Sequence, residues 1–251
     1  MNGRRRSDDA LAVEAAGLTR AFGATVAVDR LDLHVAAGQV HALVGLNGAG
    51  KSTLMRLVAG LLRPAAGSVR LWGVPAWRAP AAVRARIGLV GGGRMYPELT
   101  VLEQVTWSAR LHGCPRSVAK RRATEQIDRL ALGRWASKPA RVLSSGNQQR
   151  LALASALVHA PDLVILDEPT SALDPAGVIE LRRIITELAD RGVAVFVSSH
   201  HLDEVARLAS VISVLHDGRI VGTLPPSGVD LERQFFTIVE AAATSSAAAA
   251  R

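Results

Sequence analysis

Cysteine and long apolar runs are what this 251-residue sequence lacks. Its one cysteine, Cys114, excludes an internal disulfide and a CxxC metal site. No stretch approaches the roughly 18 uncharged apolar residues that cross a bilayer. The basic residues 4–6 are followed by Ser-Asp-Asp rather than by an apolar secretion segment. We therefore expect a cytoplasmic protein that is neither inserted into a membrane nor exported by itself.

The formal net charge of +8 and the pI near 11.0 raise the question of an anionic partner. Apart from residues 4–6 and 120–122, most basic residues are scattered singly, and arginine far outnumbers lysine. This pattern indicates a compositional bias. It predicts no specific nucleic-acid partner and leaves a weak attraction to a membrane surface open.

Residues 45–53, GLNGAGKST, match the phosphate-loop pattern G-x-x-x-x-G-K-[ST] between an apolar run and a helical pattern. Glycines let successive backbone N–H groups turn toward a phosphate, and the start of a helix adds positive potential there. Lys51 would then reach the β- and γ-phosphates, and the Ser52 hydroxyl would bind Mg²⁺. An ordinary glycine-rich turn is the alternative, which the context disfavours. The expected nucleotide-binding residues are Asn47, Gly48, Ala49, Gly50, Lys51, Ser52 and Thr53.

Alternation of apolar and polar residues over 11–35 predicts short antiparallel strands ahead of the loop. Phe22 lies within this stretch. Its ring suits stacking on an adenine, but an aromatic residue in a β-rich segment also suits the core. The sequence favours neither role.

Helical periodicity without any strand pattern marks the middle third of the chain. The elements expected before it are helix 51–62, strand 67–73, a mostly helical connection over 75–86 and strand 87–90. The glycines at 91–93 break the pattern, and residues 98–132 are then helical except for an interruption at 113–115. We expect residues 91–159 to form an inserted α-helical subdomain.

Continuous apolar runs that alternate with helices follow from residue 163 onward. Such runs are typical of strands that are covered on both faces. The expected elements are strand 163–166, a helix that opens at Asp174-Pro175, strand 193–197, helix 201–209 and strand 211–215. They predict a doubly wound α/β core of residues 11–90 and 160–240 within one domain, 11–240, with flexible tails at 1–10 and 241–251.

Three further groups of residues suggest chemistry. Asp167 and Glu168 end a buried strand, where one carboxylate can hold Mg²⁺ and the other can polarise an attacking water, although acidic strand ends are common. Residues 143–149, LSSGNQQ, precede the predicted helix 150–159 and offer a second anion-binding end, although alone they indicate only a helix cap. His200 follows a strand and can touch a γ-phosphate, although alone a histidine at such a place is more often structural.

The order of these motifs resembles the nucleotide-binding subunits of ATP-binding cassette (ABC) transporters. The resemblance covers about residues 11–225 and rests on the phosphate loop, the signature 143–148, the run LVILDE at 163–168, the loop 171–174 and Ser199-His200. It implies a P-loop NTPase (RecA-like) core with a mostly parallel sheet, an N-terminal antiparallel β-subdomain and an inserted α-helical subdomain. The implied cofactors are ATP and Mg²⁺.

The resemblance also implies a role for individual residues. Phe22 would stack on adenine, Glu168 would be the general base, His200 the switch histidine, and Asp174 the residue that couples two sites across a dimer. Cassettes of this family associate head to tail, so ATP held by Lys51 of one chain meets the signature of the other. The signature residues in that contact are Ser144, Ser145, Gly146 and Gln148.

Residues 96–101 and 198–205 resemble the exporter group that carries drugs, antibiotics or lipids. The sequence ends soon after the core, which also resembles the exporter group, because subunits that import sugars usually bear an extra C-terminal β-domain. The implied partner is a separate transmembrane permease, which places the subunit on the inner face of the cell membrane. A non-transport cassette ATPase and a binding-only cassette remain as alternatives.

Two positions depart from the family pattern. Ser145 stands where a second glycine is usual, which is a mild change. Gly92 stands where a glutamine normally ligates Mg²⁺ and senses the membrane partner. We expect the second departure to weaken the coupling between the permease and hydrolysis.

Overall fold

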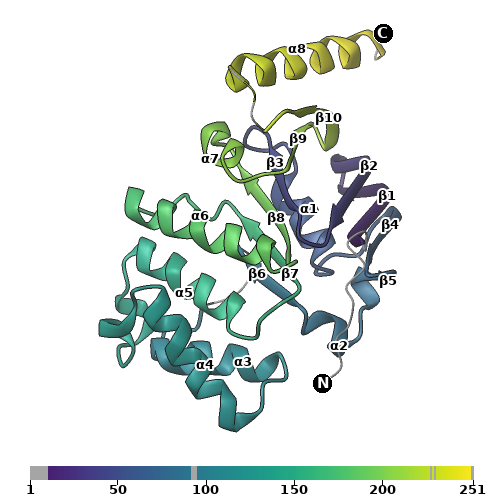
Figure 1. The fold of residues 1–251 in the computed structure, drawn as a ribbon. Helices are drawn as coiled ribbons and strands as arrows, with labels where there is room; N and C mark the ends of the chain where they lie inside the picture. The colour runs from purple at the N-terminus through teal and green to yellow at the C-terminus, as the bar shows by residue number, and fades with distance from the viewer. Residues whose placement is uncertain (1–10, 92–94, 227, 229, 250–251) are drawn as a thin grey trace.

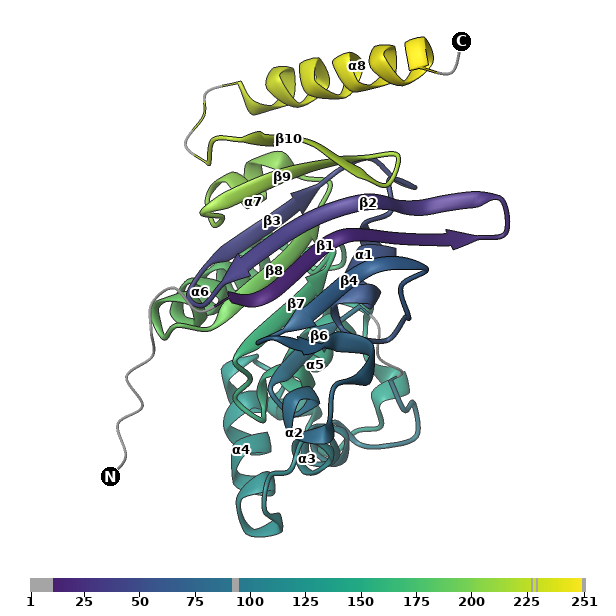
Figure 2. The same cartoon turned by 90° about the vertical axis from the view of Figure 1, so that its right-hand side faces the viewer.

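Two sheets form the centre of the molecule in the computed structural model, which describes residues 11–91, 95–226, 228 and 230–249 (Figures 1 and 2). The antiparallel sheet has the order β2-β1-β4-β5, and the larger sheet has the order β10-β9-β3-β8-β7-β6. In the larger sheet only β10 runs antiparallel to its neighbour. The strands are β1 (Leu11–Phe22), β2 (Thr25–Ala36), β3 (Val40–Val44), β4 (Ala66–Leu71), β5 (Val74–Pro75), β6 (Ile87–Val90), β7 (Leu163–Asp167), β8 (Ala194–Ser199), β9 (Val211–His216) and β10 (Arg219–Leu224).

Helices cover the larger sheet and build the separate helical region at the lower left of Figure 1. They are α1 (Lys51–Val58), α2 (Ala81–Arg84), α3 (Val101–Leu111), α4 (Arg116–Arg129), α5 (Ser145–Leu157), α6 (Pro175–Asp190), α7 (Leu202–Ala206) and α8 (Leu231–Ala249), with 3-10 turns η1 (Ala76–Arg78), η2 (Gly133–Trp135) and η3 (Ala140–Val142). In the described part of the chain, no helix is both long and apolar enough to cross a membrane.

The larger sheet is apolar on both faces, as the continuous apolar runs predict. Leu43 belongs to the cluster that fills the space between this sheet, α1 and the antiparallel sheet. Ala42 and Val44, its neighbours in β3, belong to the cluster on the other face, which includes residues of α5 and α6. Because successive side chains of a strand point to opposite faces, one five-residue strand contributes to both cores.

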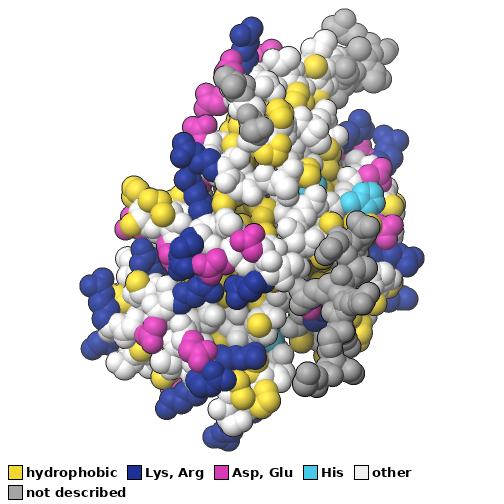
Figure 3. Space-filling view, in the orientation of Figure 1, with side chains coloured by type: hydrophobic (Ala, Val, Ile, Leu, Met, Phe, Trp, Pro, Cys, Tyr) yellow, Lys and Arg dark blue, Asp and Glu magenta, His cyan; other side chains and the backbone are white. Residues whose placement is uncertain are grey.

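The helical middle third is confirmed, with α3 and α4 separated at residues 113–115. Thr100 and Glu103 form a reciprocal capping box that fixes the start of α3. Ala109, Ala119 and Ala123 are fully buried, so small side chains allow α3 and α4 to pack closely. On the face seen in Figure 3, acidic and basic side chains lie beside one another.

Helix α1 ends at Val58, four residues before the predicted end. Gly60 follows with a φ of +71°, and a Cβ at this position would lie 2.3 Å from the Ala76 carbonyl oxygen. The chain therefore leaves the helix here and packs against η1.

The predicted tail at 241–251 is wrong in its secondary structure, because α8 continues to Ala249. Leu231, Phe235 and Val239 are spaced four residues apart and buried, and the helix packs against β9 and β10. Alanine is the strongest helix former, so the alanine-rich segment extends the docked helix. Strand β10 was also not expected. The predicted tail at 1–10 lies outside the described residues.

Candidate active site

The carboxyl ends of four neighbouring strands bring the predicted motifs together. Strands β3, β8, β7 and β6 are adjacent and parallel. They lead into the phosphate loop at 45–53, His200, the pair Asp167 and Glu168, and Gly91, respectively. Segments that are far apart in the sequence therefore meet at one edge of the sheet, where ligands bind in open α/β folds.

The phosphate loop has the backbone that its glycines predict. Gly48 and Gly50 have φ values of +86° and +107°, which favour glycine, and Gly50 caps the start of α1. A Cβ at Gly50 would lie 2.2 Å from the Ala27 carbonyl oxygen in β2. The antiparallel sheet thus holds the loop in place, and α1 begins with its N–H groups beside it.

Lys51 lies in the floor of this loop and is only 7% exposed. Its Nζ donates to the carbonyl oxygen of Gly45 at 2.7 Å and to that of Leu46 at 3.3 Å. The same Nζ lies 3.3 Å from Oε1 of Glu168. The predicted phosphate-binding cation and the predicted general base therefore touch.

Glu168 also contacts His200, whose Nδ1 lies 2.8 Å from Glu168 Oε2. Glu168 has a φ of +48°, which is uncommon for a residue other than glycine and is concentrated at functional sites. Its backbone turns out of β7 so that the carboxylate lies between the lysine and the histidine. The structure joins these three predicted residues in one contact network.

Ser198 contacts both acidic residues of the candidate site, and the sequence analysis did not assign it. Its hydroxyl donates to Asp167 Oδ1 at 2.7 Å and accepts from the Glu168 N–H at 2.9 Å. Ser198 is fully buried and lies beside Asp167 in the register of β7 and β8. One hydroxyl therefore orients both acidic residues. The signal in the sequence was a polar residue at the end of a buried strand.

The first position of the glycine run at 91–93 requires glycine for a structural reason. Gly91 has a φ of +102°, and a Cβ there would lie 2.5 Å from the Cβ of Asp167. No larger residue fits beside Asp167 without moving it. Gly92, the predicted replacement for the family glutamine, lies outside the described residues.

The signature segment is helical earlier than predicted, because α5 begins at Ser145 rather than at 150. Ser144 is its N-cap, and its hydroxyl accepts from the Asn147 N–H at 3.4 Å. Gln148 donates to the Leu143 carbonyl oxygen at 3.1 Å, which holds the turn before the helix. Ser145 and Gly146 therefore occupy the first turn, where backbone N–H groups are free of intrahelical partners.

Three contacts join this helix start to the segment that follows Glu168. Gln149 Nε2 donates to the Pro169 carbonyl oxygen at 3.0 Å, and Arg150 Nη2 donates to Asp174 Oδ1 at 3.1 Å. A Cβ at Gly146 would lie 2.9 Å from the Ala172 carbonyl oxygen.

Asp174 has a second role in its own chain. Its Oδ1 accepts the Gly177 N–H at 2.9 Å, which makes it the N-cap of α6 with Pro175 in the first turn, as predicted. The sequence analysis assigned Asp174 but missed Gln149 and Arg150, which lie on the same helix start.

Phe22 ends β1, and 48% of it is exposed. The Arg20 guanidinium lies 4.7 Å from the ring centroid. The hairpin of β1 and β2 reaches the phosphate loop, where Ala27 contacts Gly50. The exposure excludes a role in the core.

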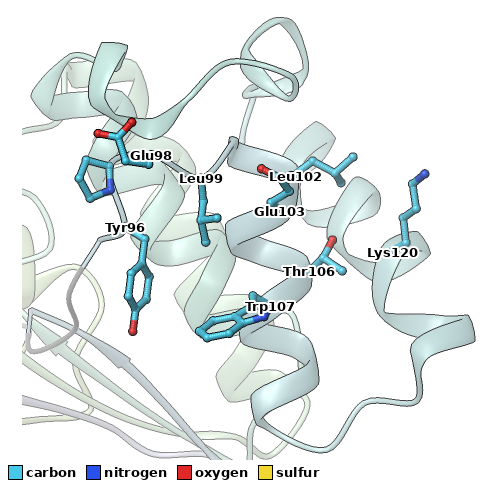
Figure 4. Close-up of a pocket in the computed structure, with 9 residues that line it drawn as sticks. Tyr96, Glu98, Leu99, Leu102, Glu103, Thr106, Trp107 and Lys120 are labelled. Carbon is cyan, nitrogen blue, oxygen red and sulfur yellow. The ribbon is translucent and has the colours of Figure 1, made fainter.

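An apolar groove of about 760 Å³ lies on the helical region (Figure 4). Tyr96 and Trp107 form its aromatic wall, with ring centroids 5.8 Å apart, and both are about half exposed. The lining residues are Tyr96, Pro97, Glu98, Leu99, Leu102, Glu103, Thr106, Trp107 and Lys120. A second cavity of about 310 Å³ shares Tyr96 and Trp107 and extends to Leu61 and β6.

Comparison with known proteins bears on this arrangement. The ABC transporter family profile matches residues 28–171, which is more than half of the chain. The chain belongs to the ABC transporter family. A second profile, an AAA domain described as a putative AbiEii toxin of type IV toxin–antitoxin systems, matches the shorter segment 137–206.

Relatives of this ABC protein are named for drug resistance, for bacitracin transport and for ribose import. The daunorubicin/doxorubicin resistance ATP-binding protein DrrA of Streptomyces peucetius is 40% identical over 84% of this chain and 64% of its own length. The bacitracin transport ATP-binding protein BcrA of Bacillus licheniformis is 34% identical over 85% and 69%. The ribose import ATP-binding protein RbsA 2 of Rubrobacter xylanophilus is 40% identical over 85% and 43%. The chain thus spans about two thirds or less of these relatives.

Solved ABC structures share the fold. An ATP-binding subunit of an ABC transporter superposes with a TM-score of 0.79 and 27% identity, over 90% of this chain and 94% of that one. A dimeric cassette in a post-hydrolysis state with ADP and Pi superposes with a TM-score of 0.79 and 25% identity, over 86% and 100%. These neighbours confirm the predicted core, antiparallel sheet and helical region as an ABC cassette.

Proposed function

We propose that this ABC cassette binds and hydrolyses ATP and thereby powers a transporter whose membrane-spanning part is a separate protein. The contact network of Lys51, Glu168 and His200 at the phosphate loop carries the proposal. A binding-only cassette needs the loop and its lysine, but it has no need of a carboxylate turned toward them by an uncommon backbone conformation.

The roles follow from these positions. The loop amides and Lys51 bind the phosphates, and the exposed face of Phe22 stacks on the adenine. Glu168 accepts a proton from the attacking water, and His200 holds that carboxylate and the γ-phosphate in place. Because the Ser198 hydroxyl accepts the backbone N–H of Glu168, the backbone that carries this base is held in place.

The residues present also suit Mg²⁺. The ion prefers hard oxygen ligands and usually keeps several waters when it binds between a protein and phosphates. Ser52 offers a hydroxyl and Asp167 a carboxylate whose Oδ1 is oriented by Ser198. Within the described residues, no group of three Asp, Glu, His or Cys side chains could hold a metal ion. The ion would neutralise charge that develops on the phosphates.

A head-to-tail dimer completes the site. Gly146, Gln149 and Arg150 hold the start of α5 against the segment 169–174 of their own chain. The backbone N–H groups in the first turn of α5, at Ser145 and Gly146, are free of intrahelical partners and available to a second chain. ATP bound at Lys51 of one chain would thus be covered by the signature of the other, with Asp174 at the junction. The dimeric neighbour with ADP and Pi supports this association.

The groove at Tyr96 and Trp107 suits the permease. It is apolar and exposed, and it begins a few residues after Gly91, which contacts Asp167. A short apolar segment of a membrane protein in this groove would contact Tyr96, which follows Gly91 by five residues in the chain. The cassette would then lie on the inner face of the cell membrane.

The proposed direction is export of a drug, antibiotic or lipid, as the names of the resistance and bacitracin relatives suggest. Import is the second candidate, because the ribose import relative is equally identical. Transport into or out of inverted vesicles that contain the permease separates them.

Glu168→Gln tests the proposal. We expect unchanged ATP binding, turnover lowered by about 10² or more, and a stable ATP-bound dimer in gel filtration. Glu125→Gln on the exposed surface of α4 makes the same chemical change away from the site and is expected to behave as the natural protein. Normal turnover by Glu168→Gln, with a monomer in ATP, would contradict the assignment.

A further inference from the structure

The charge excess of the chain lies in one stretch. Residues 33–97 contain eight lysines and arginines and no acidic residue, so this stretch alone carries the net charge of +8. Outside it, basic and acidic residues are equal in number, at 22 each. The stretch runs from β2 through the phosphate loop to β6 and the residues after it.

Most of these positive charges lie on the surface without a countercharge. Lys51 is buried in the active site, and Arg86 pairs with Asp162 at 2.7 Å. Five others are exposed: Arg56, Arg63, Arg70, Arg78 and Arg84. Within the described residues, none of these five guanidinium groups forms an ion pair.

Two of the five stack on one tryptophan, and a third lies close to it in the chain. The guanidinium groups of Arg63 and Arg78 lie 4.6 and 4.2 Å from the ring centroid of Trp77. Arg84 Nε donates to the Ala79 carbonyl oxygen at 2.9 Å, which holds its side chain beside η1. We name Arg63, Trp77, Arg78 and Arg84 the basic face.

The basic face adjoins the surface that we assign to the permease. Leu61 is 52% exposed, two residues before Arg63, and lines the second cavity together with Tyr96 and Trp107. Helices α2 and α3 lie at the same end of the molecule in both views, and α8 lies at the opposite end (Figures 1 and 2). A permease in the groove would therefore turn the basic face toward the membrane.

We propose that the basic face binds the headgroups of anionic lipids beside the permease. Guanidinium groups bind phosphate oxygens in two-pronged pairs, and tryptophan is enriched where protein meets the membrane–water interface. Clustered basic residues at an anionic leaflet each strengthen binding by about five-fold. The orientation rests on the proposed function, but lipid binding needs neither ATP nor the permease.

Vesicle binding by the purified chain tests this. We expect binding to vesicles of equal parts phosphatidylglycerol and phosphatidylcholine, weakened by salt, and little binding to phosphatidylcholine alone. The double variant R63Q/R78Q is expected to bind about 25-fold more weakly. The charge-matched control R207Q/R233Q, just after α7 and on α8 away from the basic face, should bind as the natural chain does. R63K/R78K should retain most of the binding.

Three results would overturn the proposal. Equal weakening in R63Q/R78Q and R207Q/R233Q would mean that net charge, and not the basic face, attracts the vesicles. Unchanged binding in R63Q/R78Q would place the contact elsewhere. Binding of a DNA duplex that R63Q/R78Q abolishes, without any vesicle binding, would assign the face to nucleic acid. ATP turnover of each variant, measured in parallel, tests the proposed function separately.

Discussion

Acid should destabilise this protein through His41, which lies in β3, the strand that leads into the phosphate loop. The ring is 4% exposed, and burial lowers its pKa to about 4 from a usual 6.5. His41 Nδ1 lies 3.1 Å from the His34 carbonyl oxygen, so it carries the hydrogen, and Nε2 lies 2.9 Å from Ser213 Oγ, whose hydroxyl donates to it. The folded state thus holds a neutral ring whose nitrogens are both satisfied.

The sign and size of the change in folding stability with pH follow from the pKa of His41 in the unfolded chain, 6.5, and in the folded chain, about 4. Below pH 6.5 the unfolded chain binds a proton at His41 that the folded chain does not bind until about pH 4. Stability from this residue is therefore present above pH 6.5 and is lost as the pH falls toward 4. Between pH 7.5 and pH 5 the loss is about 2 kcal/mol, out of about 3.4 kcal/mol in full.

Urea unfolding of the natural protein and of His41→Asn at both pH values measures this loss. Asparagine keeps a donor for the His34 carbonyl oxygen but does not titrate. The free-energy advantage of the natural protein over the variant should shrink by about 2 kcal/mol from pH 7.5 to pH 5. His159, whose pKa burial also lowers to about 4, is present in both proteins and cancels. An advantage that stays constant with pH would refute the reasoning.

Further predictions concern the active site. Lys51→Ala should abolish nucleotide binding by the isolated chain, as measured by calorimetry, because the buried cation of the loop is lost. Ser144→Arg should leave that binding nearly intact and prevent ATP-driven dimerisation in gel filtration; equal loss of monomer binding in both variants would mean that the two motifs serve one site within a chain. Gly91→Ala should cost about 1–2 kcal/mol of stability and slow hydrolysis, because the new Cβ would push Asp167 away. Gly92→Gln should raise the stimulation of hydrolysis by the permease; strong stimulation of the natural protein with no gain would show that another group has that role.

Local patterns in the sequence predict the phosphate loop, the strands of the core and the residues that end them. The glycines at 48 and 50 and the Asp174-Pro175 cap each leave a signal within a few neighbours. The contact of Glu168 with Lys51 depends on the order of strands, which no local pattern encodes. Ser198 was missed because its role arises from the register of β7 against β8. The helical tail was missed because the alanine-rich segment after residue 240 has no apolar spacing of its own and only continues the helix that Leu231 and Phe235 dock.

The contacts of Gln149 and Arg150 have a consequence for how two chains would work together. In a head-to-tail pair, the start of α5 touches the partner's ATP while it is bonded to the backbone that follows its own Glu168. A change at the γ-phosphate of the ATP bound to one chain would thus alter how the start of α5 in that chain binds the ATP of its partner. The two ATP molecules would therefore not be cleaved independently, and a dimer with one disabled site should be slower than half of the intact pair.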